Sequence, residues 1–135
     1  MASYLLDTNI VSAIVKNDER VNIKYRDVLS EDVNLYISGI TYYEVKRGLL
    51  YANATRKLAT FDRLRQVITI LPVSSELDIL EKASEIHADL KRRGRPIQDA
   101  DILIAATAIV NDLILVSNDT DMLRVTGVAI ENWIQ

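Results

Sequence analysis

Short apolar segments alternate along this chain with longer segments of helical periodicity, and this alternation restricts the fold more than any other feature. Strand-like segments are expected at residues 3–6, 34–38, 68–72, 113–117 and 128–131. Helical patterns are expected at 8–16, 20–31, 40–52, 55–66, 76–93 and 99–111, with a short one at 120–124. Such alternation is typical of a mostly parallel sheet covered by helices on both faces. We therefore predict a three-layer α/β/α fold with a central sheet of about five strands.

The length and composition indicate one domain over residues 1–135. No repeat, low-complexity tract or proline- and glycine-rich linker divides the sequence. A hydrophobic fraction of 49% suits a globular core and excludes disorder. Because the chain has no cysteine, disulfides and thiolate metal sites are excluded as well.

We expect a cytoplasmic protein with no membrane segment. The N-terminus lacks the charged region and long apolar stretch of a signal peptide. The longest apolar run, residues 102–110, is far shorter than the roughly 20 residues that span a bilayer. The absence of cysteine agrees with a reducing compartment.

Four acidic residues stand where strands are expected to end or helices to begin: Asp7, Glu44, Asp101 and Asp119. Asp7 and Asp119 follow expected strands, whereas Glu44 and Asp101 lie near the starts of expected helices. Ligands of open parallel sheets bind outside the carboxyl ends of the strands, so we expect all four carboxylates at one rim. Convergent carboxylates favour Mg²⁺ or Mn²⁺.

Such a cluster is costly without a counter-ion, because two carboxylates about 4 Å apart repel by on the order of 4 kcal/mol at an effective dielectric near 20. A divalent cation removes this repulsion and acidifies water for attack on a phosphodiester. The chain has one histidine, His87, which excludes paired imidazoles and a histidine-rich zinc site. We interpret His87 as a packing residue, because it shares a helical face with apolar neighbours. The pattern therefore predicts a metal-dependent nuclease.

Polar residues beside the four acids are expected to orient them through hydrogen bonds. The candidates are Thr8, Asn9, Asp99, Ser117 and Asn118, with Thr8 and Ser117 as the preferred pair. Asp99 has two interpretations, because it either contacts a metal through water or caps the helix that contains Asp101.

Each acid taken alone also has a purely structural interpretation. Asp7 and Asp119 suit helix N-caps or turns, and Thr41-x-x-Glu44 matches a capping box. Asp101 suits the first turn of a helix, where its charge complements the helix dipole. Repeated placement at one expected edge is harder to explain by independent caps, so we favour a common metal site.

The net charge of −3 is at first unfavourable for a nucleic-acid partner. Basic residues are nevertheless concentrated before the Asp101 segment, at Lys91, Arg92, Arg93 and Arg95. We interpret this basic patch either as phosphate contacts for RNA or as cations that stabilise a helix C-terminus. Because a bound metal also cancels acidity locally, the overall charge does not exclude RNA.

Taken in order, the acidic segments resemble those of the PIN-domain family. The matching stretches are Leu5-Leu6-Asp7-Thr8-Asn9-Ile10, Glu44 before Gly48, Asp101-Ile102-Leu103-Ile104-Ala105-Ala106 and Leu115-Val116-Ser117-Asn118-Asp119. The resemblance covers essentially the whole chain and is narrower for VapC-type toxins of bacterial and archaeal toxin–antitoxin pairs. It implies a Mg²⁺- or Mn²⁺-dependent endoribonuclease whose acidic site is Asp7, Glu44, Asp101 and Asp119.

The resemblance also implies partners. These are an RNA substrate, commonly tRNA or rRNA, a second copy of the chain in a homodimer, and a small antitoxin protein whose C-terminal segment occupies the cleft. One departure from the family is Asp121-Met122-Leu123, which stands where relatives often carry an aromatic residue. The role of Asp121 is left open.

Three alternatives are left beside the toxin. The first is a PIN nuclease of RNA processing or DNA metabolism, and the second is a non-catalytic RNA-binding module that keeps the acids for stability. The third, a phosphotransfer domain with an acidic pocket, is disfavoured because Asp7-Thr8-Asn9 lacks the Asp-x-Asp pair of aspartyl-phosphate hydrolases.

Overall fold

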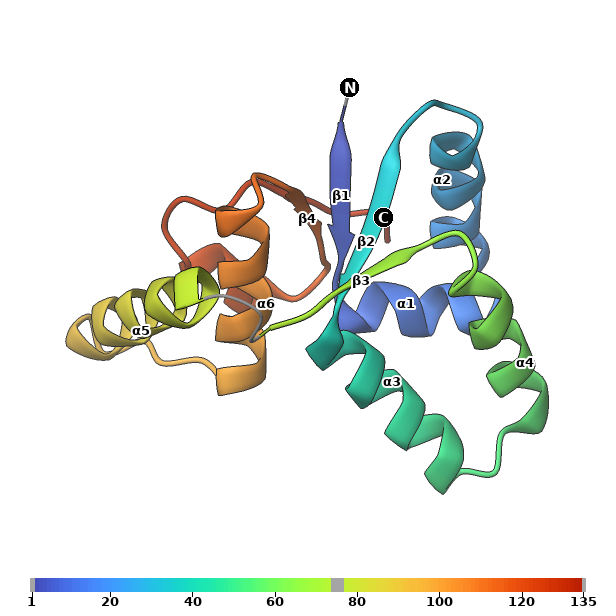
Figure 1. Ribbon diagram of the computed structural model, residues 1–135, viewed down its shortest axis with the longest axis horizontal. Coiled ribbons are helices and arrows are strands. Elements are labelled where there is room, and N and C mark those ends of the chain that lie inside the picture. The colour runs from blue at the N-terminus through green and yellow to red at the C-terminus, as the bar shows by residue number, and fades with distance from the viewer. Residues whose placement is uncertain (1, 74–76, 135) are drawn as a thin grey trace.

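The computed structural model describes residues 2–73 and 77–134. In this part of the chain five strands form one sheet in the order β3-β2-β1-β4-β5, and every neighbouring pair is parallel (Figure 1). The strands are β1 (Ser3–Leu6), β2 (Asn34–Ser38), β3 (Thr69–Leu71), β4 (Ile114–Val116) and β5 (Ile130–Glu131). The predicted α/β fold is confirmed, and the sheet is parallel throughout.

Six α-helices and one 3₁₀ helix connect the strands in the described residues. They are α1 (Thr8–Val15), α2 (Glu19–Leu29), α3 (Gly39–Tyr51), α4 (Thr55–Leu64), α5 (Leu77–Arg92), α6 (Asp99–Val110) and the 3₁₀ helix η1 (Thr120–Arg124). No helix in residues 2–73 or 77–134 is long and apolar enough to cross a bilayer.

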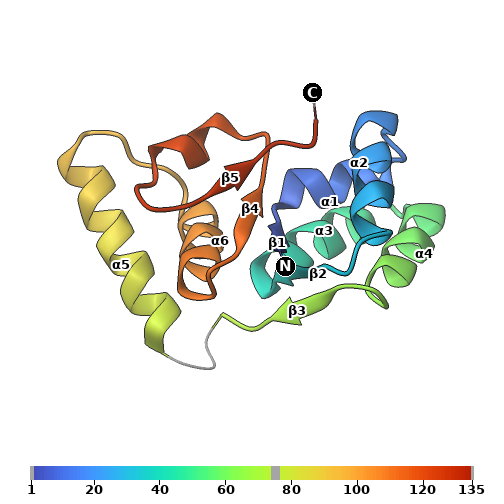
Figure 2. The ribbon, with the colours of Figure 1, turned by 90° about the horizontal axis from the view of Figure 1, so that it is seen from above.

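The helices cover both faces of the sheet, with α1 to α4 on one side and α5 and α6 on the other (Figure 2). Successive side chains of a strand point to opposite faces, so Tyr4 and Leu6 of β1 enter the core beneath α1, α2 and α4, while Leu5 enters the core beneath α5 and α6. Phe61 of α4 in the first core and Ile104 of α6 in the second are fully buried.

The strand order reverses at β1, which lies between β2 and β4 in the middle of the sheet. The register pairs Leu5 with Tyr36 of β2 and with Leu115 of β4. The backbone N–H of Asp7 then donates to the carbonyl oxygen of Val116 at 2.9 Å, which joins the ends of β1 and β4. In open α/β sheets, the carboxyl ends of the strands at such a reversal form a crevice that binds ligands.

The start of α3 differs from the predicted capping box. The N-cap is Ser38, whose hydroxyl accepts a hydrogen bond from the backbone N–H of Ile40 at 3.1 Å. Thr41 is therefore inside the helix, and the capping-box interpretation of Glu44 is wrong. Glu44 lies more than one turn into α3, which frees its carboxylate from helix capping.

Several element ends also differ from the sequence-based boundaries. The strands predicted at 68–72, 113–117 and 128–131 are shorter, because pairing is limited to Thr69–Leu71, Ile114–Val116 and Ile130–Glu131. The first residue of the helix predicted at 76–93, Glu76, lies outside the described residues, and α5 is described from Leu77 to Arg92.

Candidate functional site

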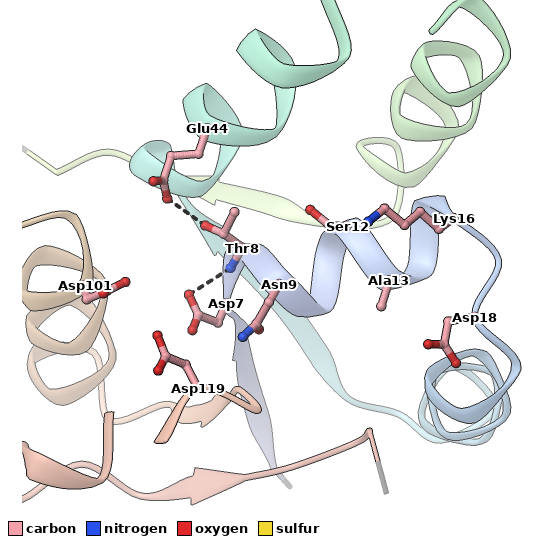
Figure 3. Close-up of a pocket in the computed structure, with 10 residues that line it drawn as sticks. All are labelled: Asp7, Thr8, Asn9, Ser12, Ala13, Lys16, Asp18, Glu44, Asp101 and Asp119. Atoms are coloured by element: carbon pink, nitrogen blue, oxygen red, sulfur yellow. Dashed lines mark hydrogen bonds between the residues drawn. The ribbon is translucent and has the colours of Figure 1, made fainter. Parts of the chain in front are cut away.

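A cleft of about 690 Å³ opens at the carboxyl end of β1 and is lined by all four acids singled out in the sequence (Figure 3). Asp7 comes from the end of β1, Glu44 from α3, Asp101 from α6 and Asp119 from the turn before η1. Figure 3 shows the carboxyl groups of Asp7, Asp101 and Asp119 turned toward a common space. The fold thus brings four distant segments to one rim.

Asp7 is the most enclosed of the four acids, with an exposed fraction of 3%. It is the N-cap of α1, and its carboxylate accepts hydrogen bonds from the backbone N–H of Thr8 at 2.8 Å and from the hydroxyl of Ser117 at 2.7 Å. Burial raises the pKa of Asp7, the two hydrogen bonds oppose this rise, and the charges of Asp119 and Glu44 add to it. The capping interpretation of Asp7 therefore holds, and capping leaves the residue inside the cleft.

Glu44 is held by a hydroxyl from the neighbouring helix. The Thr8 hydroxyl donates to Glu44 Oε1 at 2.8 Å and lies 3.2 Å from the Thr41 hydroxyl oxygen. The other carboxylate oxygen of Glu44 lies 3.8 Å from the Arg47 guanidinium, which is largely exposed. Thr8 thus ties α1 to α3 and fixes one edge of the cleft.

The tightest group of carboxylates lies at the opposite edge. Oxygens of Asp101, Asp119 and Asp121 lie within 4.8 Å of one another. No other set of three or more acidic or histidine side chains in the described residues lies this close together. Asp119 is the N-cap of η1 and accepts from the backbone N–H of Asp121 at 2.9 Å, while its own N–H donates to the Ser117 hydroxyl at 3.0 Å. Arg124 lies 3.3 Å from Asp121 and balances part of this charge.

Burial and the crowding of negative charge change the pKa of Asp101. Burial, followed by the charges of Asp7, Asp119, Glu44 and Asp121, raises the pKa of Asp101 to about 6. A carboxylate whose pKa is raised in this way marks a site where negative charges are not balanced by positive ones. A cation bound at such a site is strongly stabilised by the surrounding carboxylates.

The donors in the cleft fit a hard divalent cation. Carboxylate oxygens are the ligands that Mg²⁺ and Mn²⁺ prefer. Asn9 adds an amide oxygen that is buried and has no hydrogen-bond partner in the described part of the chain. His87 lines a different cavity, so no nitrogen ligand of the kind zinc favours reaches the cleft.

Two of the predicted supporting residues lie outside the cleft. Asn118 is exposed between Ser117 and Asp119. Asp99 is also exposed and lines a separate cavity between α5 and α6, together with His87. The N-cap of α6 is Gln98, so the interpretation of Asp99 as that cap is wrong. By contrast, Thr8 and Asn9 line the cleft, and Ser117 donates to Asp7.

The basic patch at the end of α5 does not line the cleft. All four of its residues, Lys91, Arg92, Arg93 and Arg95, are exposed. Arg93 pairs with Asp89 at 2.8 Å and donates to the carbonyl oxygen of Arg124 at 2.6 Å, so it fastens α5 to η1. Gly94 has a φ of +66°, which is typical of the glycine that ends a helix. The structure therefore supports the helix-end interpretation of this patch.

Asp121 is the member of the cluster whose role the sequence left open. The available signal was its spacing in Ser117-Asn118-Asp119-Thr120-Asp121, where a turn places two acids side by side. The strand pattern does not locate Asp121, because this residue lies in the 3₁₀ helix beyond the turn.

Comparison with known proteins agrees with this geometry. A family model described as PIN domain matches residues 4–128.

Toxin FitB of Neisseria gonorrhoeae is 34% identical over 135 aligned positions, covering 95% of this chain and 96% of the relative. The tRNA(fMet)-specific endonuclease VapC of Shigella flexneri is 30% identical over 141 positions, covering 98% of this chain and 99% of the relative. The structure of DNA-bound VapBC from Salmonella typhimurium matches with a TM-score of 0.84 at 27% identity, covering 98% of this chain and 99% of that one. The chain therefore belongs to the PIN-domain family, in which its relatives are VapC-type toxins.

Proposed function

We propose that this protein is a divalent-metal-dependent endoribonuclease and the toxin of a toxin–antitoxin pair. The observation that carries the proposal is the group of three carboxylates, Asp101, Asp119 and Asp121, with oxygens within 4.8 Å of one another at the edge of the cleft. Asp7 and Glu44 line the same cleft. The relatives named toxin FitB and endonuclease VapC support the class of reaction.

We assign metal binding to Asp101, Asp119 and Asp121, with Asp7 beside them. A divalent ion bound there supplies charge that stabilises the phosphodiester transition state and lowers the pKa of water. Ser117 keeps Asp7 and the Asp119 turn in register, because its hydroxyl touches both. These contacts fix the orientation of the Asp7 carboxylate and of the Asp119 turn, and such fixed groups preorganise a site for reaction.

The sequence predicts Glu44 in the common metal site, but this proposal gives it a separate role. Its carboxylate is oriented by the Thr8 hydroxyl at 2.8 Å and lines the cleft from α3, across from Asp119 (Figure 3). We assign to it the acceptance of a proton from the attacking water, since a general base needs a fixed position near the reacting atoms. Thr8 is the positioning residue for this step.

The proposal includes three partners. The substrate is RNA, in keeping with the ribonuclease and tRNA endonuclease names of relatives. An antitoxin protein is supported by the VapBC complex among the structural neighbours. A homodimer agrees with the exposed apolar side chains Tyr43, Leu50 and Tyr51 of α3, with exposed fractions of 58%, 55% and 92%.

Purified Asp119→Asn protein tests the proposal. We expect it to fold and to lose cleavage of cellular RNA in Mn²⁺ by about 10²-fold or more, the size of effect seen when one electrostatic group is removed from an active site. The matched control is Asp112→Asn, which removes an exposed carboxylate outside the cleft at a φ of +54° that asparagine readily adopts.

Equal RNA cleavage by Asp119→Asn and the wild type would refute the assignment. Binding of RNA without any cleavage by the wild type would favour the non-catalytic module instead. Growth arrest on expression, relieved by the product of a neighbouring small gene, distinguishes a toxin from a PIN nuclease of RNA processing or DNA metabolism.

A further inference from the structure

The cleft does not end at the acids but continues along α1 to Ser12 and Lys16. Thr8, Ser12 and Lys16 are spaced four residues apart, which places them in one row on the same side of the helix. Figure 3 shows the side chains of Ser12 and Lys16 extending from the side of α1 that carries Thr8. The row begins at Thr8, which donates to Glu44, and ends at the ammonium group of Lys16.

The charge of Lys16 is available to a ligand. Lys16 is exposed and takes part in no ion pair among residues 2–73 and 77–134. Asp18, the acid at this end of the cleft, is engaged by Arg20 through bonds of 3.2 Å from Nε and 2.8 Å from Nη2. The acidic cleft therefore has a basic end.

A second, smaller cavity extends this basic end toward α4. It has a volume of about 220 Å³ and shares Ser12, Lys16 and Glu44 with the acidic cleft. Its far wall includes Lys57 of α4, which is exposed and forms no ion pair within the described part of the chain. Two lysines that form no ion pair in the described residues thus line this smaller cavity, which adjoins the acidic cleft at Ser12, Lys16 and Glu44.

The distance between the two ends of the row determines what kind of ligand can contact both of them. Eight residues of helix separate Thr8 from Lys16, which is about 12 Å along the axis. A ligand that contacts both the clustered acids and Lys16 therefore has to extend along α1. A nucleic-acid strand carries regularly repeated phosphates and places one at each end of such a groove.

We propose that Lys16, Ser12 and Lys57 form a phosphate-binding track that holds the RNA backbone on one side of the bond being cut, so that the substrate lies along α1. This inference rests on the proposed ribonuclease function and adds the path of the strand. Phosphate contacts of this kind position a strand and do not read its sequence. The alternative site for phosphate contacts is the basic patch at Lys91, Arg92, Arg93 and Arg95. This patch lies outside the cleft, and its Arg93 already contacts Asp89 and the carbonyl oxygen of Arg124.

The test compares Lys16→Gln, Lys57→Gln and the double variant with the wild type on a labelled single-stranded oligoribonucleotide. Each phosphate contact that is lost should reduce the magnitude of the slope of log affinity against log salt concentration by about 0.7. The slope of the double variant should therefore be smaller in magnitude than that of the wild type by about 1.4. For RNA cleavage, we expect a higher KM and little change in kcat. Lys16→Arg should restore most of the affinity, because it keeps the charge.

Two controls separate the track from a structural effect. Lys82→Gln removes the same charge from α5, where Lys82 pairs with Glu85 at 3.1 Å and lines another cavity. It should leave the salt slope unchanged. A dinucleotide, which has a single phosphodiester, cannot reach both ends of the cleft, so Lys16→Gln should raise its KM far less than it raises the KM of the oligoribonucleotide.

The outcomes also separate this inference from the proposed function. If the wild type cleaves RNA but Lys16→Gln keeps its salt slope and KM, the track is wrong and the nuclease assignment stands. The track is also wrong if Lys91→Gln alone reproduces the loss, or if Lys16→Gln weakens binding of an acidic partner protein and leaves RNA binding intact. A wild type that cleaves no RNA overturns the proposed function itself.

Discussion

At the scale of single residues, the cleft depends on two hydroxyls that each reach an acid from a distant segment. Thr8 donates to Glu44, and Ser117 donates to Asp7 while accepting from the backbone of Asp119. Both hydroxyls could be singled out from the sequence, because they follow strand ends. Their acidic partners could not be assigned, because such pairing depends on how strands separated by many residues align.

Replacing Ser117 by alanine should cost about 1–3 kcal/mol in the free energy of unfolding, because the change leaves a buried carboxylate and a backbone N–H without this partner. RNA cleavage should fall as well, since Asp7 loses its orientation. Urea denaturation measures the first effect and a cleavage assay the second. Ser84→Ala is the control, because the Ser84 hydroxyl is exposed and bonds only within α5. Equal stability of the two variants would show that the Ser117 contacts are of no consequence.

Replacing Asp101 by asparagine should stabilise the metal-free protein at neutral pH. Folding raises the pKa of Asp101 from 3.8 to about 6, so the folded state binds the proton more tightly than the unfolded state. The ionised carboxylate therefore destabilises the fold above pH 6, and this effect fades as the pH falls toward 3.8. After allowance for solvent screening, the gain of Asp101→Asn above pH 6 is on the order of 1 kcal/mol.

Urea titrations in EDTA from acidic to neutral pH measure this difference. The wild type and Asp101→Asn should unfold alike at the acidic end and separate as the pH rises. Excess Mn²⁺ should reverse the order, because only the wild type keeps the full set of carboxylates. A constant offset at every pH would contradict the titration of Asp101 and point to a packing effect.

At the scale of elements, periodicity in the sequence located every strand and helix of the described residues but not all of their ends. The strand ends are set by pairing, and β5 pairs with β4 only at Ile130 and Glu131. The start of α3 was placed late, because Ser38 ends β2 and caps the helix at the same time. The position of Asp121 could not be predicted for a similar reason. The turn at Asp119, and not the end of a strand, places Asp121 in the cluster.

Helix α6 holds Asp101 at the cleft through close packing of small residues. Ala105, Ala106 and Ala108 are fully buried. Ala106→Leu should therefore overpack the core and lower the free energy of unfolding by roughly 1–3 kcal/mol. The same change at the exposed Ala59 of α4 should stay within about 0.5 kcal/mol. Denaturation curves of both variants check the contrast, and a neutral Ala106→Leu would mean that the space around α6 is looser than the burial indicates.

At the scale of the whole molecule, the cleft lies where the two helical layers meet across β1. Glu44 comes from the side of α1 to α4, whereas Asp101 comes from the side of α5 and α6. The parallel sheet and its rim followed from the sequence pattern. The basic end of the cleft did not, because the proximity of Lys16 to the acids and to Lys57 becomes visible only when α1, α3 and α4 are packed.

A metal bound across this junction should stabilise the entire fold. A ligand that binds only the folded state at 100 times its Kd adds about 2.7 kcal/mol. We expect Mn²⁺ to raise the Tm of the wild type and EDTA to reverse the rise. Asp119→Asn should show little response, while Asp112→Asn should respond like the wild type. A Tm that ignores Mn²⁺ in every variant would be inconsistent with a metal site in the cleft.

The hydrogen bond between Ser117 and Asp7 joins residues that are 110 positions apart. During synthesis, the first acid therefore leaves the ribosome long before its partner exists. A truncated or nascent polypeptide that stops short of β4 lacks Ser117, Asp119 and Asp121 altogether. The proposed ribonuclease activity is in this way postponed until residues 117–121 have been translated.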